Sequence, residues 1–118
     1  MTTLTEKSWK TICDTTDLVT DSGISALIAN AAGEDEQIAI FHIPNSEEKI
    51  YAVGNYDPIG NANVLYRGLV GSIEDEPVVS SPLYKQHFSL RTGQCLQEEK
   101  SIAVYPIRIE NEQVQVLY

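Results

Sequence analysis

The apolar residues of this chain occur in short groups that are separated by turn-forming residues. The longest apolar runs, such as Ala26–Ala29 and Ile38–Phe41, contain only four residues. A run of this length is far too short for a transmembrane helix. It suits a β-strand, and many short strands with turns between them are typical of a sandwich or a partly open barrel. We therefore expect an all-β fold of short antiparallel strands.

The clearest hairpin in the first half of the chain joins Gln37–Ile43 to Lys49–Val53. The first segment is rich in β-branched and aromatic residues, and a Pro-Asn-Ser turn ends it. The second segment alternates, so that Ile50 and Ala52 share one face while Tyr51 lies on the other. Further strands are expected at residues 25–29, 69–73, 77–79 and 87–90, with an acidic turn at residues 74–76.

The two ends of the chain give a second hairpin and an ambiguous segment. Ile107 and Ile109 alternate with a polar residue, Asn111-Glu112 makes a turn, and apolar residues alternate again up to Tyr118. This pattern predicts a terminal β-hairpin. Residues 8–18 fit either a helix or a strand; we favour the strand, with Trp9 as a core anchor beneath the sheet.

Charge narrows the classes of partner. Acidic residues outnumber basic residues by 17 to 8, which gives a formal net charge of −9. Such a chain repels phosphate groups, and no basic stripe compensates, so neither nucleic acid nor an anionic membrane is an expected partner. The charge is typical of a soluble surface; the alternative is docking to a basic patch on another protein.

The length of 118 residues is that of one ordinary domain, and no linker or repeat divides the chain. We therefore expect a single domain over residues 1–118. The first residues contain no apolar stretch of signal-peptide length, which favours a cytoplasmic location. Cys13 and Cys95 belong to no CxxC motif, so we expect two reduced thiols; a disulfide between them is the alternative.

Motifs of the common catalytic sites are missing. The sequence contains no phosphate loop, no dinucleotide-binding glycine motif, no zinc-protease helix and no nucleophile elbow. His42 lies inside a predicted strand and His87 beside an aromatic residue, and we interpret neither as a general base. The carboxylate groups at residues 47–48, 74–76 and 98–99 are interpreted as solvent-exposed turns. We predict no catalytic residue, no cofactor and no metal site in this chain.

Two proline-containing loops stand out. The first, residues 55–60, reads Asn-Tyr-Asp-Pro-Ile-Gly and follows a predicted strand; the second, residues 80–93, contains Ser81-Pro82-Leu83-Tyr84 and ends in Phe-Ser-Leu-Arg-Thr-Gly. Each alone is a plain connection between strands. Together, and in this order, they resemble the two cluster-binding loops of Rieske proteins. In that family each loop supplies one Cys and one His to a two-iron, two-sulfur cluster.

The ligand positions of that motif are not retained. At the positions of the first Cys and His of the Rieske motif, this sequence has Asp57 and Ile59. At the positions of the second Cys and His, it has Ser81 and Tyr84. Iron–sulfur clusters need thiolates, with imidazole as the Rieske substitute, so no cluster is expected. We expect Asp57 and Ser81 to accept backbone hydrogen bonds within their turns, and Ile59 and Tyr84 to fill the space with apolar surface. Residues 61–66 are expected to be an insertion.

A cluster-free Rieske-like chain of this size is similar to the small subunits of bacterial NAD(P)H-dependent assimilatory nitrite reductases. That resemblance covers nearly the whole chain, from the Trp9 region to the final hairpin. It implies a non-catalytic subunit that supports a large catalytic subunit during the reduction of nitrite to ammonium. FAD, siroheme and an iron–sulfur cluster are implied for the large subunit alone.

The resemblance also suggests a docking surface, because the two loops form an exposed tip in Rieske proteins. Tyr and Arg are enriched at interfaces. The expected contacts are Tyr56, Tyr66, Arg67, Tyr84, Lys85 and His87. Three other readings remain open: a stand-alone interaction or regulatory module on the same scaffold, an electron-transfer ferredoxin, and an independent hydrolase or metal enzyme.

Overall fold

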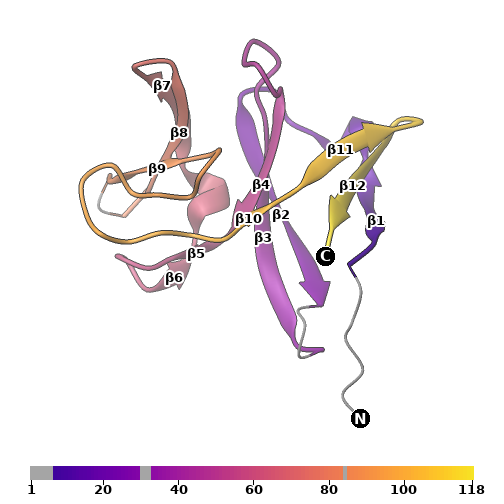
Figure 1. Cartoon of the computed structure of the whole chain (residues 1–118), viewed down its shortest axis with the longest axis horizontal. Coiled ribbons are helices and arrows are strands. Elements are labelled where there is room, and N and C mark those ends of the chain that lie inside the picture. The colour runs from indigo at the N-terminus through magenta and orange to yellow at the C-terminus, as the bar shows by residue number, and fades with distance from the viewer. Residues whose placement is uncertain (1–6, 30–32, 84) are drawn as a thin grey trace.

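The computed structural model describes residues 7–29, 33–83 and 85–118 (Figure 1). Helical structure in this part of the chain is limited to two 3₁₀ turns, η1 (Thr15–Asp17) and η2 (Leu65–Arg67). The described strands, in chain order, are β1 (Trp9–Asp14), β2 (Ser22–Ala29), β3 (Asp35–His42), β4 (Ile50–Gly54), β5 (Tyr56–Asp57), β6 (Ala62–Asn63), β7 (Leu69–Ile73), β8 (Glu76–Ser80), β9 (His87–Ser89), β10 (Val104–Tyr105), β11 (Ile107–Glu110) and β12 (Gln113–Leu117). The all-β expectation is confirmed.

The described strands form antiparallel sheets with the orders β1-β12-β11, β10-β4-β3-β2, β5-β6 and β7-β8-β9. The β3–β4 hairpin stands at the centre of Figure 1, with the β1-β12-β11 sheet on one side and the β7-β8-β9 sheet on the other. This arrangement confirms the expected Rieske-like, partly open architecture. It places the two proline-containing loops in the half of the molecule that includes β5 to β9.

The β3–β4 hairpin is buried on both faces. Ile38–Phe41 and Ile50–Val53 are all buried, and the two strands pair in register, with Phe41 opposite Tyr51. Successive side chains of a strand point to opposite faces, so the hairpin contributes to two apolar clusters at once. This explains why its strands are continuous apolar runs rather than strictly alternating ones.

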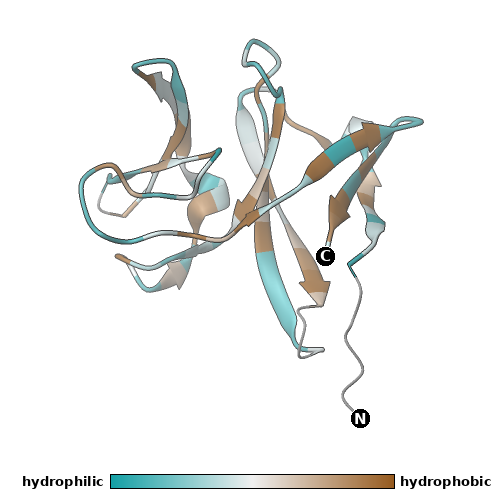
Figure 2. Ribbon diagram, in the orientation of Figure 1, coloured by the Kyte–Doolittle hydropathy of each residue, from teal (hydrophilic) through white to brown (hydrophobic). Residues whose placement is uncertain are grey.

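The first cluster, which we call the base cluster, lies between the hairpin and the β1-β12-β11 sheet. Its buried members are Ile28, Ile38, Ile40, Ile50, Ala52, Val114 and Val116. Val114 and Val116 come from β12, where Gln115 between them is only half-buried. Figure 2 shows the resulting alternation of hydrophobic and hydrophilic residues along β11 and β12, and the predicted terminal hairpin is confirmed.

The second cluster, the loop-side cluster, lies on the opposite face of the hairpin. Its buried members are Ala39, Phe41, Tyr51, Val53, Leu65, Val79, Phe88, Leu90, Cys95 and Ile102. It joins β3 and β4 to β8, β9 and the residues that follow β9. Leu65 is fully buried, so the residues that we expected to be an insertion, 61–66, contribute to the core.

Two details of the sequence interpretation are wrong. Trp9 is 36% exposed, and Arg108 lies over its ring, 4.2 Å from the centroid. It stands at the start of an edge strand, whereas Ile12 and Cys13, at a register shift in β1, pack against the base cluster. The acidic turn is also shorter than expected: Glu74 and Asp75 form it in left-handed conformations, and Glu76 is already the first residue of β8.

Both cysteines are free, which agrees with the expected reduced thiols. Cys13 is partly exposed and Cys95 is buried.

Tyr105 of β10 donates a hydrogen bond to Glu36 Oε2 at 2.9 Å, and burial together with this carboxylate raises the pKa of Tyr105 to about 12. Among the described residues, no helix has the length and apolar character needed to cross a bilayer.

Candidate functional site

The first loop is built around Asp57, the last residue of β5. Asp57 Oδ1 accepts a hydrogen bond from the Ile59 N–H at 2.9 Å, and the Asp57 carbonyl accepts one from the Asn61 N–H at 2.7 Å. Asn61 has a left-handed backbone conformation, with a φ of 55°. Asn tolerates this conformation better than most residues do. A side-chain acceptor two residues before its donor is the Asx turn that the sequence predicted.

The second loop repeats this geometry around Ser81. Ser81 Oγ accepts a hydrogen bond from the Leu83 N–H at 3.2 Å, and the Ser81 carbonyl accepts one from the Lys85 N–H at 2.9 Å. Lys85 is left-handed, with a φ of 64°. The expectation for Ser81 is therefore confirmed. The two loops are local copies of one turn, each centred on a position where the Rieske motif has a cysteine.

The two turns contact each other through the same two side chains. Ser81 Oγ donates a hydrogen bond to Asp57 Oδ2, although the residues are 24 positions apart. Asp57 has no exposed surface and Ser81 only 1%. Gly60 allows this close approach, because a Cβ there would lie 2.5 Å from Leu83 Cδ1 and 2.9 Å from Asp57 Oδ2. A hydrogen bond thus joins the loops at the point where the Rieske motif has metal ligands.

The residues at the four ligand positions do not fit a two-iron, two-sulfur cluster. Asp57 and Ser81 offer hard oxygen atoms that already bind each other and the backbone. Ile59 has no donor atom and packs against the loop-side cluster, as expected. Tyr84 lies outside the described residues. A cluster of this type needs thiolate or imidazole ligands, and within the described ranges no group of three His, Cys, Asp or Glu residues could hold a metal ion.

Asn55 fastens the first loop to the sheet. Its side chain is fully buried; Nδ2 donates to Gln37 Oε1 at 3.1 Å and to the Asn63 carbonyl at 3.2 Å, while Oδ1 accepts from the Tyr66 N–H at 2.8 Å. Each side-chain atom capable of hydrogen bonding therefore has a partner, as a buried amide requires. Asn55 holds residues 61–66 against β3 and so positions η2.

The predicted docking residues fall into separate groups. Tyr56 is 47% exposed and donates a hydrogen bond to Asn61 Oδ1. Arg67 Nε donates to the Tyr66 hydroxyl at 2.8 Å, so these two form a pair on η2. Lys85 is exposed, and His87 is half-buried beside Gln97, whose Nε2 lies 3.0 Å from His87 Nδ1. In the described part of the chain, no hydrogen bond links the η2 pair to Lys85 or His87; Tyr84 is outside that part.

Two exposed leucines near the second loop were missed as candidates. Leu83 is 48% exposed, and Leu96 is 44% exposed beside β9, where its N–H donates to the His87 carbonyl. A leucine in a turn is the sequence signal that could have identified Leu83. Leu96 has no such signal, because its place beside His87 depends on the fold.

A cluster of charges around Arg91 was also missed. Arg91 binds Glu48 at 2.8 Å, Glu47 at 3.2 Å and Glu76 at 3.5 Å. The hydrogen bond from Arg91 lowers the pKa of Glu48. Glu47 and Glu48 lie in an exposed turn, as predicted, but they also hold that turn to the segment after β9. This contact could not be predicted from local sequence patterns, because Arg91 and Glu48 are 43 residues apart.

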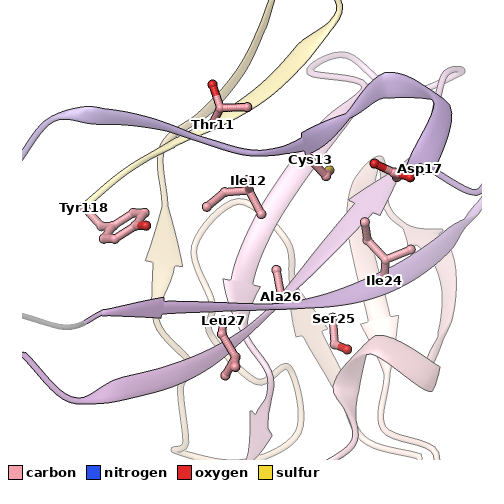
Figure 3. A pocket seen from close by; sticks show the side chains of 9 residues that line it. All are labelled: Thr11, Ile12, Cys13, Asp17, Ile24, Ser25, Ala26, Leu27 and Tyr118. Carbon is pink, nitrogen blue, oxygen red and sulfur yellow. The ribbon is translucent and has the colours of Figure 1, made fainter.

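A separate groove lies between β1 and β2, with a volume of about 520 Å³ (Figure 3). Ile12 of β1 and Ala26 of β2 point toward each other across it, and Cys13 lies near Asp17. Burial, with the nearby carboxylates of Asp17 and Asp14, raises the pKa of the Cys13 thiol. A thiol with a raised pKa is a poor nucleophile at neutral pH.

Comparison with known proteins agrees with this fold. Residues 8–117 match the family described as the Rieske-like [2Fe-2S] domain, and the chain belongs to that family. A nitrite reductase (NADH) small subunit from Escherichia coli K12 is 38% identical over 109 residues, which are 92% of this chain and 95% of that protein. The crystal structure of a putative NADH-dependent nitrite reductase small subunit from Mycobacterium tuberculosis superposes with a TM-score of 0.80 and 33% identity, covering 95% of this chain and 96% of that one. Within the Rieske-like family, the chain therefore belongs with the nitrite reductase small subunits.

One relative has a different organisation. A nitrite reductase [NAD(P)H] large subunit from Klebsiella oxytoca is 39% identical to 96% of this chain, but the matched stretch is only 11% of that protein. In that relative, the counterpart of this chain is one segment of a much longer polypeptide.

Proposed function

We propose that this chain is the small, non-catalytic subunit of a cytoplasmic NADH-dependent nitrite reductase and that it supports a large catalytic subunit. The observation that carries the proposal is the relationship with small subunits over nearly their whole length, 95% of the Escherichia coli protein. In this proposal, FAD, siroheme and the iron–sulfur cluster belong to the large subunit, which reduces nitrite to ammonium.

The proposal includes the absence of a cluster from this chain. The buried contact between Asp57 and Ser81 supports it, because both side chains are committed to a hydrogen bond that closes the space between the loops. Packing of Ile59 against the core supports it further. The loops thus keep the Rieske arrangement by hydrogen bonds and apolar contacts rather than by metal–ligand bonds.

Association with a large subunit is supported by the Klebsiella oxytoca relative. There, the counterpart of this chain lies within a protein named as the large subunit. A covalent link keeps two modules at a high effective concentration, and separate subunits would need a docking surface instead. We propose the tip as part of that surface, with contacts from Tyr56, Tyr66, Arg67, Tyr84, Lys85 and His87, together with Leu83 and Leu96.

The experiment that tests this function combines an iron assay with a binding measurement. The chain, purified without oxygen, should be folded, colourless and free of iron and acid-labile sulfide. It should also bind the purified large subunit, as measured by surface plasmon resonance. At the tip, the double variant Tyr56→Ala with Lys85→Asn should weaken this binding about tenfold; Asn is chosen because it tolerates the positive φ of Lys85.

Each part of the result has a contrary outcome. A brown protein with stoichiometric iron and sulfide would make electron transfer the leading function. A colourless chain that does not bind the large subunit would favour a stand-alone module. Unchanged affinity of the double variant, with Lys100→Ala as the surface control, would remove the tip from the interface.

A further inference from the structure

Strand β7 has an open edge. It is the outer strand of the β7-β8-β9 sheet, and among the described residues it pairs only with β8. Glu74 and Asp75 close the hairpin as a two-residue turn, so Ile73 and Glu76 form a hydrogen-bonded pair. Hydrogen-bonded pairs alternate along an antiparallel ladder. The N–H and C=O groups of Val70 and Ser72 therefore point away from β8, and none of them has a backbone partner within the described ranges.

This edge lacks the features that usually protect an edge strand. Lysine, proline and inward-pointing charges normally prevent pairing with another chain, and β7 reads Leu-Val-Gly-Ser-Ile. Leu69 is 81% exposed, and a Cβ on Gly71 would meet no described atom within 4 Å. Figure 1 shows the β7–β8 hairpin projecting from the rest of the molecule. The strand β2 is also an uncharged outer strand of its sheet. It differs from β7 in that β1 lies beside it, across the groove of Figure 3.

A groove of about 580 Å³ runs along this edge. It is lined by the consecutive residues Leu69–Ser72 of β7, and also by Pro77 of β8 and by Arg91. Its opposite wall includes Ile43 and residues 45–47. A second, smaller groove contacts Leu69–Ile73 of β7, Val78 and Ser80 of β8 and His87 of β9, so it lies over a face of the β7-β8-β9 sheet. The sheet that has the open edge therefore also contains His87, which is one of the proposed tip residues.

The larger groove is acidic. Asp21, Glu47 and Asp75 line it, and the cation among its lining residues is Arg91. Arg91 is already bound by Glu47, Glu48 and Glu76. Asp21 and Asp75 are exposed. This local excess of carboxylates favours an occupant with Lys or Arg side chains.

We propose that β7 is the docking edge for an extended, basic segment of the large subunit, which adds to the β7-β8-β9 sheet as a further strand. This proposal rests on the proposed function, since it names the contact through which the two subunits associate. Main-chain hydrogen bonds to Val70 and Ser72 provide affinity, as in other cases of strand addition. Apolar side chains of the segment lie against Leu69 and Ile43, and its cationic side chains reach Asp21 and Asp75.

Amide hydrogen exchange tests the proposal directly. Exchange is measured by NMR on the labelled full chain, alone and after incubation with the purified large subunit. The free amides of Val70 and Ser72 should exchange at least about tenfold more slowly in the complex, because strand addition gives them partners. The amides of Gly71 and Ile73, already paired with β8, serve as internal controls and should change little.

A matched pair of variants at one position tests the same contact. Ser72→Pro removes an outward N–H without removing a bond to β8, and Gly71 before it minimises the steric clash that proline imposes on its neighbour. It should weaken large-subunit binding about tenfold or more, whereas Ser72→Ala, which keeps the N–H, should bind normally. Circular dichroism and the Tm confirm that both variants fold. If Ser72→Pro does not fold, Asp21→Asn with Asp75→Asn replaces it, and should weaken binding and reduce its salt dependence.

The outcomes separate this proposal from the proposed function. Binding without protection of Val70 and Ser72, or equal affinity of the proline and alanine variants, overturns the docking edge and leaves the subunit assignment standing. Failure of the wild-type chain to bind the large subunit overturns both. Concentration-dependent protection of the same amides in the isolated chain would identify a second copy as the occupant and overturn the proposal.

Discussion

At the scale of single residues, the pair Asp57 and Ser81 joins the two loops that resemble the cluster-binding loops of Rieske proteins. Each side chain caps its own turn, and the Ser81 hydroxyl then donates to Asp57 across the two loops. Both side chains are buried. Buried polar groups are costly unless they are hydrogen-bonded. The two residues therefore depend on each other.

This dependence predicts the effect of Ser81→Ala. The substitution leaves Asp57 Oδ2 buried without its donor, and it should lower the free energy of unfolding by about 1–3 kcal/mol. Urea denaturation measures the change. Ser25→Ala, at an exposed position of β2, is the control and should stay within about 0.5 kcal/mol of the wild type. Equal stabilities of the two variants would show that the contact does not hold the loops together.

At the scale of elements, Arg91 ties three segments together: the turn after β3, the start of β8 and the turn after β9. Ser89 Oγ adds to this junction, since it donates to Glu76 and accepts from the Arg91 N–H at 3.1 Å. Exposed ion pairs contribute little individually. Their joint effect here is to orient the β7–β8 hairpin, and with it the open edge, relative to the central hairpin.

The ion pair between Arg91 and Glu48 gives a pH-dependent prediction. The hydrogen bond from Arg91 lowers the pKa of Glu48 below its ordinary value of 4.5. The ion pair therefore stabilises the folded chain fully above that pH. This stabilisation disappears as the pH falls through the lowered pKa of Glu48. At pH 7, Glu48→Gln should lower the Tm by at most about a few degrees. In the acid range, the difference between the variant and the wild type should disappear. A Tm difference that persists unchanged at pH 3 would contradict this origin.

At the scale of the whole molecule, the β3–β4 hairpin connects the two apolar clusters. Ile40 and Phe41 are adjacent in sequence, yet one packs in the base cluster and the other in the loop-side cluster. Because both clusters include residues of this hairpin, displacement of the hairpin would expose both clusters to solvent. We therefore expect the chain to unfold as one unit, in keeping with the single domain that its length predicts.

Phe88→Ala tests this coupling. Phe88 is fully buried in the loop-side cluster, and its truncation should lower the free energy of unfolding by about 3–5 kcal/mol. Fluorescence of Trp9, the single tryptophan, reports on β1 at the far side of the molecule. Its transition should coincide with that of far-UV circular dichroism, as two-state unfolding requires.

The controls for this prediction use milder changes. Phe88→Leu serves if the alanine variant does not fold, and Leu27→Ala, at a side chain with 62% exposure, should have little effect. An early loss of far-UV signal with an unchanged Trp9 transition would show that the two halves unfold separately.

Local features were predictable because their causes lie within a few residues. The strands at residues 37–43 and 107–118 follow from alternation and β-branched side chains, and the turn at Asn111-Glu112 adopts the left-handed pair that a two-residue hairpin favours. The Asx turn at Asp57 was predicted for the same reason. The motif spacing of the loops was enough to indicate the family, although its metal ligands are replaced.

The tertiary structure alone decided which distant residues meet. Nothing near Ser81 in the sequence indicates that its hydroxyl binds Asp57, and nothing near Arg91 indicates Glu48. Trp9 was expected in the core, but its place on an edge strand depends on how β1 pairs with β12. The open edge of β7 is likewise a property of sheet order, which no local pattern encodes. Alternation and turn chemistry act between neighbours, whereas burial and pairing depend on the closure of the whole chain.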